Sequence, residues 1–461
     1  MPVSTLENIF KAYDVRGLVP EQFDSKIAYA VGVGFAQFVL GDSDSTDRPS
    51  KVLVARDMRP SGVELVAQFA LGVQSQGLDV VDLGLGSTDL LYFAAGSLDA
   101  PGAMFTASHN PAQYNGIKFC LSGARPVGID TGLATVRDTA KDVLAGNGPQ
   151  PVATPGLRTE RDMLDEFADH VVSFIDINSI KPMKIVADTA NGMGGLIVPI
   201  VFERLPMIEL EVMYPELDGT FPNHPADPIQ PANQRDLQAR VVSGGFDIGL
   251  AFDGDADRVF VVDEKGRGLS GSTTTAILAA GVLRANPGAT VLYNLICSRS
   301  VPEVIRENGG VPVRTKVGHS NIKQVMAETG AVFGGEHSAH YYFLDNYRAD
   351  SGIIATMFML QELSRADTVL STLRQPFERY EASGEINTSV HDADVVMKAV
   401  AEQYKSMPQD WIDGLTVDCG DWWFNLRPSN TEPLLRLNLE ASTRDDCDNH
   451  VAEVLSLVTS I

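Results

Sequence analysis

The chain has 461 residues, which predicts about three domains, with two or four also compatible, and a core large enough to fold without disulfides. Its 36 Lys and Arg against 60 Asp and Glu give a net charge of −24. So acidic a chain excludes nonspecific binding to nucleic acid or to anionic membranes, since both need a cationic surface. Any phosphate site must therefore be a local basic pocket.

Cysteines and targeting segments add little. The four cysteines form no CxxC pair, the N-terminal residues show no basic segment followed by an apolar run, and no apolar stretch reaches the roughly 18 residues that span a bilayer. These absences predict a reduced cytoplasmic protein without a zinc ribbon, a signal peptide or a membrane span. No long amphipathic arm indicates a partner, so we expect a monomer or a dimer.

Short β-rich runs alternate with helical runs along most of the chain. Residues 51–57 predict a buried strand, 61–77 a helix and 78–84 the next strand. The same order recurs over 183–214 and again over 271–330. Taken alone, strand–helix–strand order implies parallel pairing with right-handed crossovers.

The last part of the chain has a different pattern. A helix around 393–406 is followed by several short strands, which predicts an α+β domain with an antiparallel sheet. A Gly/Pro-rich stretch at 146–156 is a linker candidate. The domains that we expect are 1–150, 151–253, 254–366 and 367–461.

The segment DGDADR is the strongest candidate for a metal site. Asp253, Asp255 and Asp257 stand at i, i+2 and i+4 in a tight turn between two apolar strands. Oxygen-only ligation suits Mg²⁺ or Ca²⁺ rather than zinc. An EF-hand is excluded because Arg258 stands where that loop needs glycine, and the flanks are strands rather than helices. A solvated turn is a poor alternative, because three uncompensated carboxylates would repel one another.

The segment TASHNP follows the apolar strand AMFTA and exposes the hydroxyl of Ser108 in a tight loop. His109 and Lys118 are near in sequence, so the loop predicts a serine nucleophile or phosphate carrier with a nearby base. The alternative is a polar β-turn. A serine hydrolase is disfavoured because the GxSxG pattern is absent.

Two later loops carry groups that suit an anionic sugar. KVGHSNIK places His319 and lysines at a helix start, where anions bind, although such a histidine is more often a structural cap. GGEHSAHYYF offers Glu336 and Ser338 to the hydroxyls of a polyol. His337 and His340 could instead bind a metal at helical spacing, but the following aromatic run indicates a strand.

The segment RPSNTEP is the best candidate for a phosphate pocket. Arg427 supplies a planar fork for phosphate oxygens, and the turn adds short hydroxyl and amide donors. An ordinary turn with a surface arginine is the alternative. Near the N-terminus, YDVRG places Arg16 before a glycine turn, facing either a cleft or a carboxylate.

In this order, these segments resemble the α-D-phosphohexomutases, the family of bacterial phosphomannomutase and phosphoglucomutase. The resemblance covers nearly the whole chain, from YDVRG to RPSNTEP, and TASHNP and DGDADR are each specific for the family. It implies an α/β fold of three similar domains with mixed sheets and a smaller C-terminal α+β domain around a central cleft. The implied mixed sheets differ from the wholly parallel pairing that the alternation alone suggests.

The resemblance also implies a mechanism. The enzyme would interconvert mannose 6-phosphate and mannose 1-phosphate through a phosphoserine at Ser108 and a hexose 1,6-bisphosphate. Asp253, Asp255 and Asp257 would bind Mg²⁺ together with a phosphoserine oxygen. The other implied catalytic residues are His109 and Lys118 for proton transfer and Arg258 on the phosphoserine. The implied substrate-binding residues are Tyr13, Arg16, His319, Glu336, Ser338, Arg427, Ser429, Asn430 and Thr431.

Departures from the family pattern leave the substrate open. The sugar loop is GEHSAH where many members that use mannose or glucose phosphates have GEMSGH, and His337 disfavours the glucosamine-type loop, which often has Gln there. Ile296 stands where some relatives carry a lysine in the cleft. The expected small molecules are hexose phosphates, with glucose 1,6-bisphosphate or mannose 1,6-bisphosphate as activator. The alternatives are activity on glucose phosphates, a phosphoglucomutase, a phosphoglucosamine mutase and a non-catalytic sugar-phosphate binder.

Overall fold

The computed structural model describes residues 4–41, 48–428 and 434–460, without the side chains of Ser4, Thr5 and His319. The chain divides into two compact units. The first comprises Met1–Leu269 with Ser338–Ser371, and the second comprises Ser270–His337 with Thr372–Ile461. The four domain boundaries expected from the sequence stay a prediction. Within the described ranges, no helix is long and apolar enough to cross a membrane.

The N-terminal sheet of the first unit is mixed. Its strands lie in the order β1–β5–β4–β2–β3–β7, with β6 paired to β5. β2 is parallel to β3 and β4, whereas β5 is antiparallel to both β1 and β4. The expected mixed sheet is thus confirmed, and wholly parallel pairing is wrong because β5 turns back beside β4. The strands are β1 (Val15–Leu18), β2 (Lys51–Arg56), β3 (Asp79–Leu85), β4 (Gly102–Phe105), β5 (Tyr114–Leu121), β6 (Arg125–Pro126) and β7 (Arg158–Glu160).

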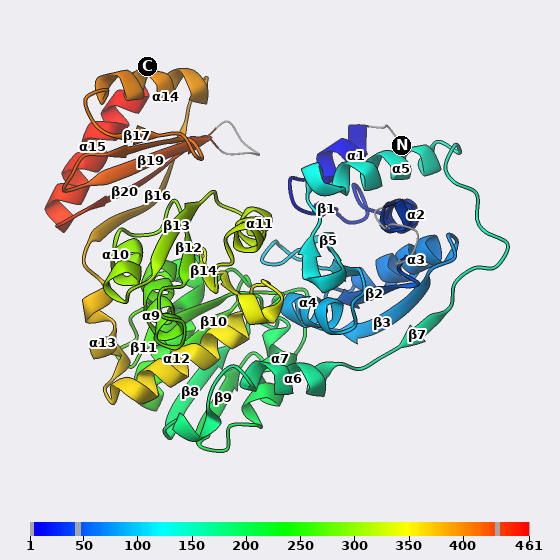
Figure 1. The fold of residues 1–461 in the computed structure, drawn as a ribbon, viewed down its shortest axis with the longest axis horizontal. Helices are drawn as coiled ribbons and strands as arrows, with labels where there is room; N and C mark the ends of the chain where they lie inside the picture. Colours follow the sequence, from blue (N-terminus) through cyan, green and yellow to red (C-terminus); the bar gives the residue numbers. More distant parts are fainter. Residues whose placement is uncertain (1–3, 42–47, 429–433, 461) are drawn as a thin grey trace. The chain divides into compact units, whose positions relative to one another are not determined.

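One face of this sheet packs against three helices that lie together (Figure 1). Side chains alternate along a strand. In β5, Ile117, Phe119 and Leu121 therefore enter this core, while Lys118 points to the opposite face. The helix α4 packs against β2, β4 and β5. The helices are α1 (Ser4–Ile9), α2 (Ser25–Gly41), α3 (Gly62–Gln74), α4 (Thr88–Ser97) and α5 (Leu133–Leu144), of which α2, α3 and α5 form the group of three.

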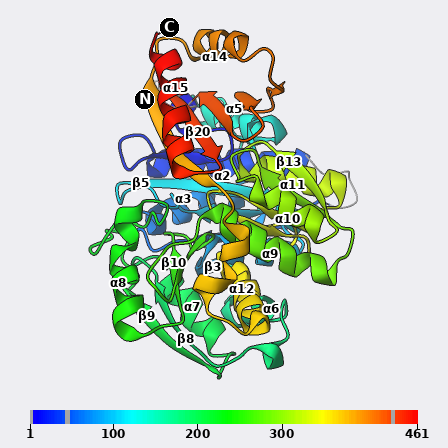
Figure 2. The ribbon, with the colours of Figure 1, turned by 90° about the vertical axis from the view of Figure 1, so that its left-hand side faces the viewer.

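The second sheet of the first unit carries the predicted metal loop. Its order is β11–β10–β8–β9, with β10 antiparallel to β11 and the other pairs parallel. The loop Asp253–Arg258 joins β10 to β11 as expected. Figure 2 shows α8 on one side of this sheet and α12 on the other. The remaining helices and strands of the first unit, not all of them in this sheet, are α6 (Leu164–Val172), β8 (Met183–Asp188), α7 (Gly194–Phe202), β9 (Ile208–Met213), α8 (Arg235–Gly244), β10 (Ile248–Phe252), β11 (Val259–Asp263), β15 (Tyr341–Phe343) and α12 (Gly352–Ala366).

The second unit contains a parallel sheet and an antiparallel one. β12 is parallel to β13 and β14, and helices follow or precede these strands as the sequence predicts. The C-terminal strands pair antiparallel in the order β16–β20–β19–β18–β17, and α14 and α15 pack against them. This confirms the α+β character of the last domain.

The elements of the second unit are α9 (Gly271–Ala285), β12 (Thr290–Asn294), α10 (Ser300–Glu307), β13 (Val311–Thr315), α11 (His319–Thr329), β14 (Phe333–Gly335), β16 (Glu381–Ser389), α14 (Ala393–Gln403), β17 (Gln409–Asp410), β18 (Leu415–Asp418), β19 (Trp423–Pro428), β20 (Leu434–Ala441) and α15 (Arg444–Ser460). The short helix α13 (Leu370–Leu373) contains the point at which the chain passes from the first unit to the second.

Candidate active site

Ser108 lies in the turn between β4 and β5, where the sequence predicts an exposed hydroxyl. It is instead 5% exposed, and its φ of +49° is left-handed, a region that non-glycine residues rarely adopt. The Ser108 amide donates to Thr106 Oγ1 at 2.8 Å. A Cβ on Gly254 of the metal loop would lie 2.4 Å from the Ser108 carbonyl oxygen. Glycine at 254 therefore lets the metal loop and the serine loop touch.

Arg59 holds the serine loop from behind. Its side chain is fully buried, its Nε donates to Asp57 Oδ2 at 3.1 Å, and its guanidinium lies over the ring of Phe221 at 5.2 Å. Its Nη atoms donate to the carbonyl oxygens of Ser108 (2.9 Å), Asn110 (2.6 Å), Pro111 (2.8 Å) and Tyr114 (3.0 Å). Five bonds from one planar fork fix the loop conformation. Nothing in the sequence marked Arg59, because the loop carbonyl oxygens to which it donates belong to residues 49 to 55 positions away.

The three aspartates of the metal loop converge. Carboxylate oxygens of Asp253, Asp255 and Asp257 lie within 4.8 Å of one another, and all three side chains are buried. The Ser108 hydroxyl donates to Asp253 Oδ2 at 2.9 Å, across 145 residues of sequence. Arg258 Nε donates to the same oxygen at 2.9 Å, and its Nη2 reaches Ser108 Oγ at 3.4 Å. The sequence-predicted serine, aspartates and arginine therefore form one cluster.

Lys118 completes the cluster from the sheet. Its ammonium donates to Asp255 Oδ2 at 2.8 Å and to Asp257 Oδ2 at 2.7 Å. Although burial alone would lower it, the charges of Asp255 and Asp257 hold the pKa of Lys118 well above its ordinary value. The Thr88 hydroxyl, at the start of α4, also donates to Asp255 Oδ2, at 2.6 Å. Burial raises the pKa of Asp253 to about 8, an effect that Arg258 opposes.

The triad suits a hard divalent cation. Asp255 Oδ1 and Asp257 Oδ1 are buried and accept no hydrogen bond, while the second oxygen of each carboxylate is occupied by Lys118. A buried acceptor without a partner is costly, and an all-oxygen donor set is the chemistry of Mg²⁺ sites. These acidic residues can therefore hold a metal ion.

His109 faces Ser108 and Arg258. Its Nδ1 lies 3.2 Å from Ser108 Oγ and 2.5 Å from Arg258 Nη2. Because a guanidinium can only donate, Nδ1 accepts, and its lone pair is engaged. Burial, aided by Arg258, holds the pKa of His109 well below its ordinary value.

Arg16 ties β1 to the serine loop. Its Nη1 donates to Asn110 Oδ1 at 2.6 Å, and its Nη2 pairs with Asp14 at 2.5 Å. Of the two residues expected near the N-terminus, Arg16 thus joins the serine loop, while Tyr13 is a half-buried neighbour just before β1.

The structure adds a histidine–aspartate pair that we did not assign from the sequence. His340 Nδ1 bonds to Asp350 Oδ2 at 2.9 Å and lies 3.9 Å from Asp257 Oδ1. Burial lowers the pKa of His340, but Asp350 and Asp257 outweigh burial and raise it above its ordinary value. A carboxylate only accepts, so Nδ1 carries the proton and the lone pair is on Nε2. His340 was recognised in its motif, but Asp350 carries no motif.

In the second unit, Glu336 is a buried carboxylate held at the end of β14. Its Oε1 accepts from Asn294 Nδ2 and from the Gly318 amide, each at 3.1 Å. Ser338, two residues on, is partly exposed and belongs to the first unit. The side chain of His319 lies outside the described part of the structure.

Arg427 stands at the end of β19, directly opposite Arg436 of β20. Arg427 Nη2 donates to Glu385 Oε2 at 3.4 Å, and Arg436 Nη1 lies 3.5 Å from Glu385 Oε1. Two adjacent guanidinium groups concentrate positive charge and present the planar donors that suit an anion. The predicted partners Ser429, Asn430 and Thr431 lie outside the described residues.

The comparisons with known proteins agree with this geometry. Family models of phosphoglucomutase/phosphomannomutase match in chain order: α/β/α domain I over residues 7–142, domain II over 165–267, domain III over 270–380 and the C-terminal domain over 385–457. The chain belongs to the phosphoglucomutase/phosphomannomutase family. It is accordingly a phosphohexomutase, an enzyme of the isomerase class, with the four domains of that family.

Individual relatives extend over nearly the full length of the phosphohexomutase. It is 39% identical over 443 residues to a protein named phosphohexose mutases from Xanthomonas campestris, covering 95% of each chain. It is 35% identical over 459 residues to a phosphomannomutase from Escherichia coli, covering 98% of each. A crystal structure of a phosphoglucomutase/phosphomannomutase family protein from Burkholderia thailandensis matches with a TM-score of 0.87 and 31% identity over 98% of both chains.

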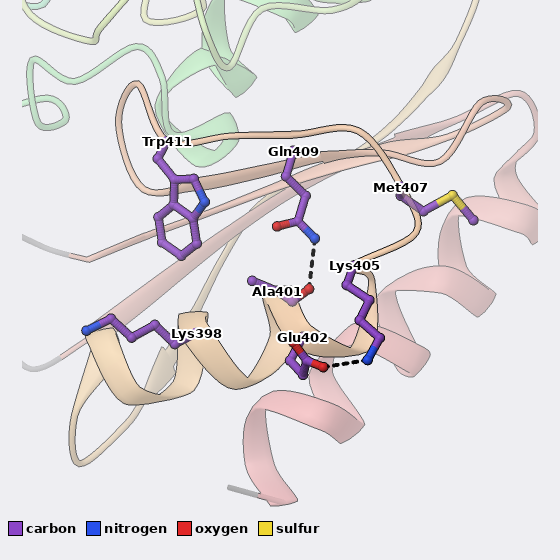
Figure 3. A pocket seen from close by; sticks show the side chains of 7 residues that line it. All are labelled: Lys398, Ala401, Glu402, Lys405, Met407, Gln409 and Trp411. Atoms are coloured by element: carbon purple, nitrogen blue, oxygen red, sulfur yellow. Dashed lines mark hydrogen bonds and ion pairs between the residues drawn. The ribbon is translucent and has the colours of Figure 1, made fainter.

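A pocket in the C-terminal domain of this phosphohexomutase is lined by residues of which none was predicted as a site residue (Figure 3). It is open, and its Trp411 is 50% exposed. Gln409 Nε2 donates to the Ala401 carbonyl at 2.8 Å across it, and Lys405 pairs with Glu402 at 2.6 Å. Its titratable lining residues, Lys398, Glu402 and Lys405, are all exposed.

Proposed function

We propose that this phosphohexomutase interconverts mannose 6-phosphate and mannose 1-phosphate through a phosphorylated Ser108 and a hexose 1,6-bisphosphate, with glucose phosphates as further substrates. The observation that carries the proposal is the bond from Ser108 Oγ to Asp253 within a buried carboxylate triad that Arg258 and Lys118 brace. A hydroxyl that lies beside a cation site and a guanidinium is the arrangement that phosphoryl transfer needs. The named relatives support the mannose assignment.

The proposed cofactor is Mg²⁺, held by Asp253, Asp255 and Asp257 with an oxygen of the phosphorylated Ser108. The two unpartnered carboxylate oxygens and the all-oxygen donor set support this choice. When bound, the ion would supply positive charge to the oxygens of the transferring phosphoryl group. Glucose 1,6-bisphosphate or mannose 1,6-bisphosphate would prime the enzyme by phosphorylating Ser108.

In the forward step, a sugar hydroxyl attacks the phosphorus of phosphorylated Ser108. The new P–O bond forms as the bond to Ser108 Oγ breaks, and the electron pair stays on Oγ, where Arg258 stabilises it. The bisphosphate then turns end over end and returns its other phosphate to Ser108. Arg258 is suited to this role because its Nη2 already reaches Ser108 Oγ at 3.4 Å.

The attacking hydroxyl must lose a proton. His109 and Lys118 were the sequence candidates, but the Nδ1 lone pair of His109 faces Arg258, and Lys118 is held protonated between two carboxylates. We therefore add His340, whose ring Asp350 orients and whose Nε2 lone pair is available as a base. This is the arrangement in which a carboxylate fixes an imidazole tautomer.

The sugar and the non-reacting phosphate are assigned from the sequence. Glu336 and Ser338 would bind sugar hydroxyls, with Tyr13, Arg16 and His319 as further contacts. Arg427 would bind the phosphate with Ser429, Asn430 and Thr431. The neighbouring Arg436, which shares Glu385 with Arg427, supports an anion site on these strands.

The test is a coupled rate assay with Mg²⁺ and a trace of glucose 1,6-bisphosphate, which compares mannose 1-phosphate, glucose 1-phosphate and glucosamine 1-phosphate. We expect the highest kcat/KM on the mannose substrate and measurable turnover of the glucose substrate. Preference for the amino sugar would replace the proposal by a phosphoglucosamine mutase. Binding of all three sugars without turnover would make the chain a non-catalytic binder.

A further inference from the structure

Asp89 is a fully buried carboxylate that has no part in the chemistry above. It lies in the first turn of α4, and within the described residues no Lys, Arg or His pairs with it. Its Oδ1 accepts a short hydrogen bond from the Ser87 hydroxyl, and its Oδ2 accepts one from Ser351 Oγ at 2.6 Å. Burial raises the pKa of Asp89 to about 7. Buried carboxylates usually face a cation, so one held only by hydroxyls calls for a reason.

Both serines are N-caps of helices. Ser87 Oγ accepts from the Leu90 amide at 3.3 Å and begins α4, and Ser351 Oγ accepts from the Ile354 amide at 3.2 Å and begins α12. Each serine Oγ therefore accepts a hydrogen bond from a helix-start amide and donates one to Asp89. Helix N-termini favour negative charge, so two of them stabilise the one carboxylate. Asp89, at the start of α4, thereby bonds to the cap of α12, which is 262 residues away in sequence.

Each of these helix starts also contacts the metal loop or its neighbours. At α4, the Thr88 amide donates to the Asp255 carbonyl at 3.2 Å, and its hydroxyl donates to the Asp255 carboxylate. At α12, Asp350 precedes the cap and bonds to His340. A Cβ on Gly352 would lie 2.8 Å from the carbonyl carbon of Arg258, so α12 begins directly against the metal loop. Asp89 is therefore bonded to both of the helix starts that contact the metal loop.

We propose that Asp89 is a positioning residue of the phosphohexomutase, which holds Ser87 and Ser351 together and so fixes Thr88 against Asp255 and Asp350 against His340. The proposal rests on the proposed metal site and on the proposed role of His340. Within the described residues, the hydrogen bonds of the Asp89 carboxylate go to Ser87 and Ser351 and to none of the three aspartates of the metal loop. Asp89 acts through the two helix starts. The start of α4 affects Mg²⁺ binding, and the start of α12 affects proton transfer.

Substitutions at Asp89 test the proposal. Asp89→Leu keeps the approximate size but leaves two buried hydroxyls without an acceptor. We expect it to weaken Mg²⁺ binding, measured by titration calorimetry without sugar, by about tenfold or more. At saturating Mg²⁺ we expect kcat to fall by a similar factor while KM for the sugar phosphate is unchanged. Asp89→Asn should keep most of the Mg²⁺ affinity and most of kcat, because its carbonyl accepts from one serine and its amide donates to the other.

The two arms separate in serine variants. Ser87→Ala should weaken Mg²⁺ binding more than it lowers kcat at saturating Mg²⁺, since it loosens Thr88. Ser351→Ala should lower kcat and leave Mg²⁺ binding near that of the wild type, since it loosens Asp350. These variants and Asp89→Asn carry the test if Asp89→Leu does not fold.

The matched control is Glu362, a buried acid farther along α12. Glu362→Leu should lower the melting temperature without changing the Mg²⁺ affinity. An Asp89→Leu enzyme that melts lower but binds Mg²⁺ and turns over like the wild type would make Asp89 a structural brace only and overturn the proposal. A wild type that neither binds Mg²⁺ nor turns over would instead refute the proposed function, and the positioning role with it.

Discussion

The metal loop of the first unit and the arginine pair of the second are both clusters of like charge, but they are built in opposite ways. The three aspartates are buried, and Lys118, Arg258, Thr88 and the Ser108 hydroxyl bond to them at 2.6 to 2.9 Å. The two arginines are partly exposed, and they share one carboxylate at 3.4 to 3.5 Å.

This difference matches the role that we propose for each cluster. Charges around the reacting phosphoryl group act best when they are already in place, because reorganisation during the reaction is costly. In the proposed mechanism, the arginine pair receives either end of a turning bisphosphate and must accept more than one geometry. We therefore expect substitutions in the first cluster to change kcat and those in the second to change KM.

The largest effect should come from the nucleophile. Ser108→Ala removes the atom that would carry the phosphoryl group in the proposed mechanism, and we expect kcat to fall by about a thousandfold or more. The coupled assay measures this, and labelled glucose 1,6-bisphosphate should no longer label the protein. Ser243→Ala, on the exposed part of α8, is the control and should remain active. A Ser108→Ala enzyme that still exchanges phosphate would contradict the phosphoserine mechanism.

Next comes the support behind the serine loop. Arg59→Lys keeps one positive charge but loses the fork that bonds four carbonyl oxygens. We expect the free energy of unfolding to drop by about 3 kcal/mol and kcat to fall about tenfold or more, with KM little changed. Urea denaturation and steady-state kinetics measure both. The control is Arg56→Lys at the end of β2, and equal losses in the two variants would show that Arg59 has no special hold on the loop.

The arginine pair should show the reverse split. Arg427→Ala removes a charged donor from the proposed phosphate site, and we expect KM for the sugar phosphate to rise about tenfold while kcat changes less. Arg436→Ala should act in the same direction but more weakly, because its side chain is more exposed, 32% against 11%. Arg444→Ala, on the exposed start of α15, is the control. A fall in kcat alone would break the distinction between the clusters.

The smallest effect concerns pH and a buried acid behind the arginine strands. Burial raises the pKa of Glu440 on β20 to about 7, although Ser298 Oγ donates to it at 3.0 Å. A raised carboxyl pKa stabilises the fold below about pH 4.5, and this contribution is lost as the pH rises toward 7. Relative to the wild type, Glu440→Gln should therefore gain up to about 3 kcal/mol between pH 4.5 and 7.5.

Urea denaturation at the two pH values measures this gain, with the exposed Glu402→Gln as the control. The amide oxygen of the glutamine can still accept from Ser298, so the substitution removes the charge and keeps the bond. A difference between variant and wild type that stays constant with pH would show that Glu440 titrates as an ordinary surface carboxyl.

The sequence was informative where chemistry is concentrated in one short segment. Asp253, Asp255 and Asp257 could be predicted as a cluster because a hairpin brings alternate residues together, and Ser108 because a strand ends in a turn. That these two loops meet, 145 residues apart, came from the family resemblance and not from spacing. The α/β order and the α+β tail were likewise readable from periodicity.

The supports of the site could not be predicted in this way. Arg59, Thr88 and Asp350 act through contacts with residues outside their own segments, and a lone arginine, threonine or aspartate has no pattern that names its partner. The antiparallel β5 was missed for a related reason, since strand direction depends on a connection that periodicity does not record. A short motif identifies the residues that carry the chemistry, whereas the residues that position them are determined by tertiary contacts.

The left-handed backbone of Ser108 has a consequence for which alcohol the enzyme can use. A β-branched residue is a genuine outlier at a φ of +49°, so threonine, the other aliphatic hydroxyl amino acid, is excluded from this position by its own backbone. In the proposed mechanism, the phosphate carrier is thereby restricted to a primary alcohol. Its ester carries no methyl group beside the leaving oxygen, which leaves the line of attack through phosphorus unobstructed.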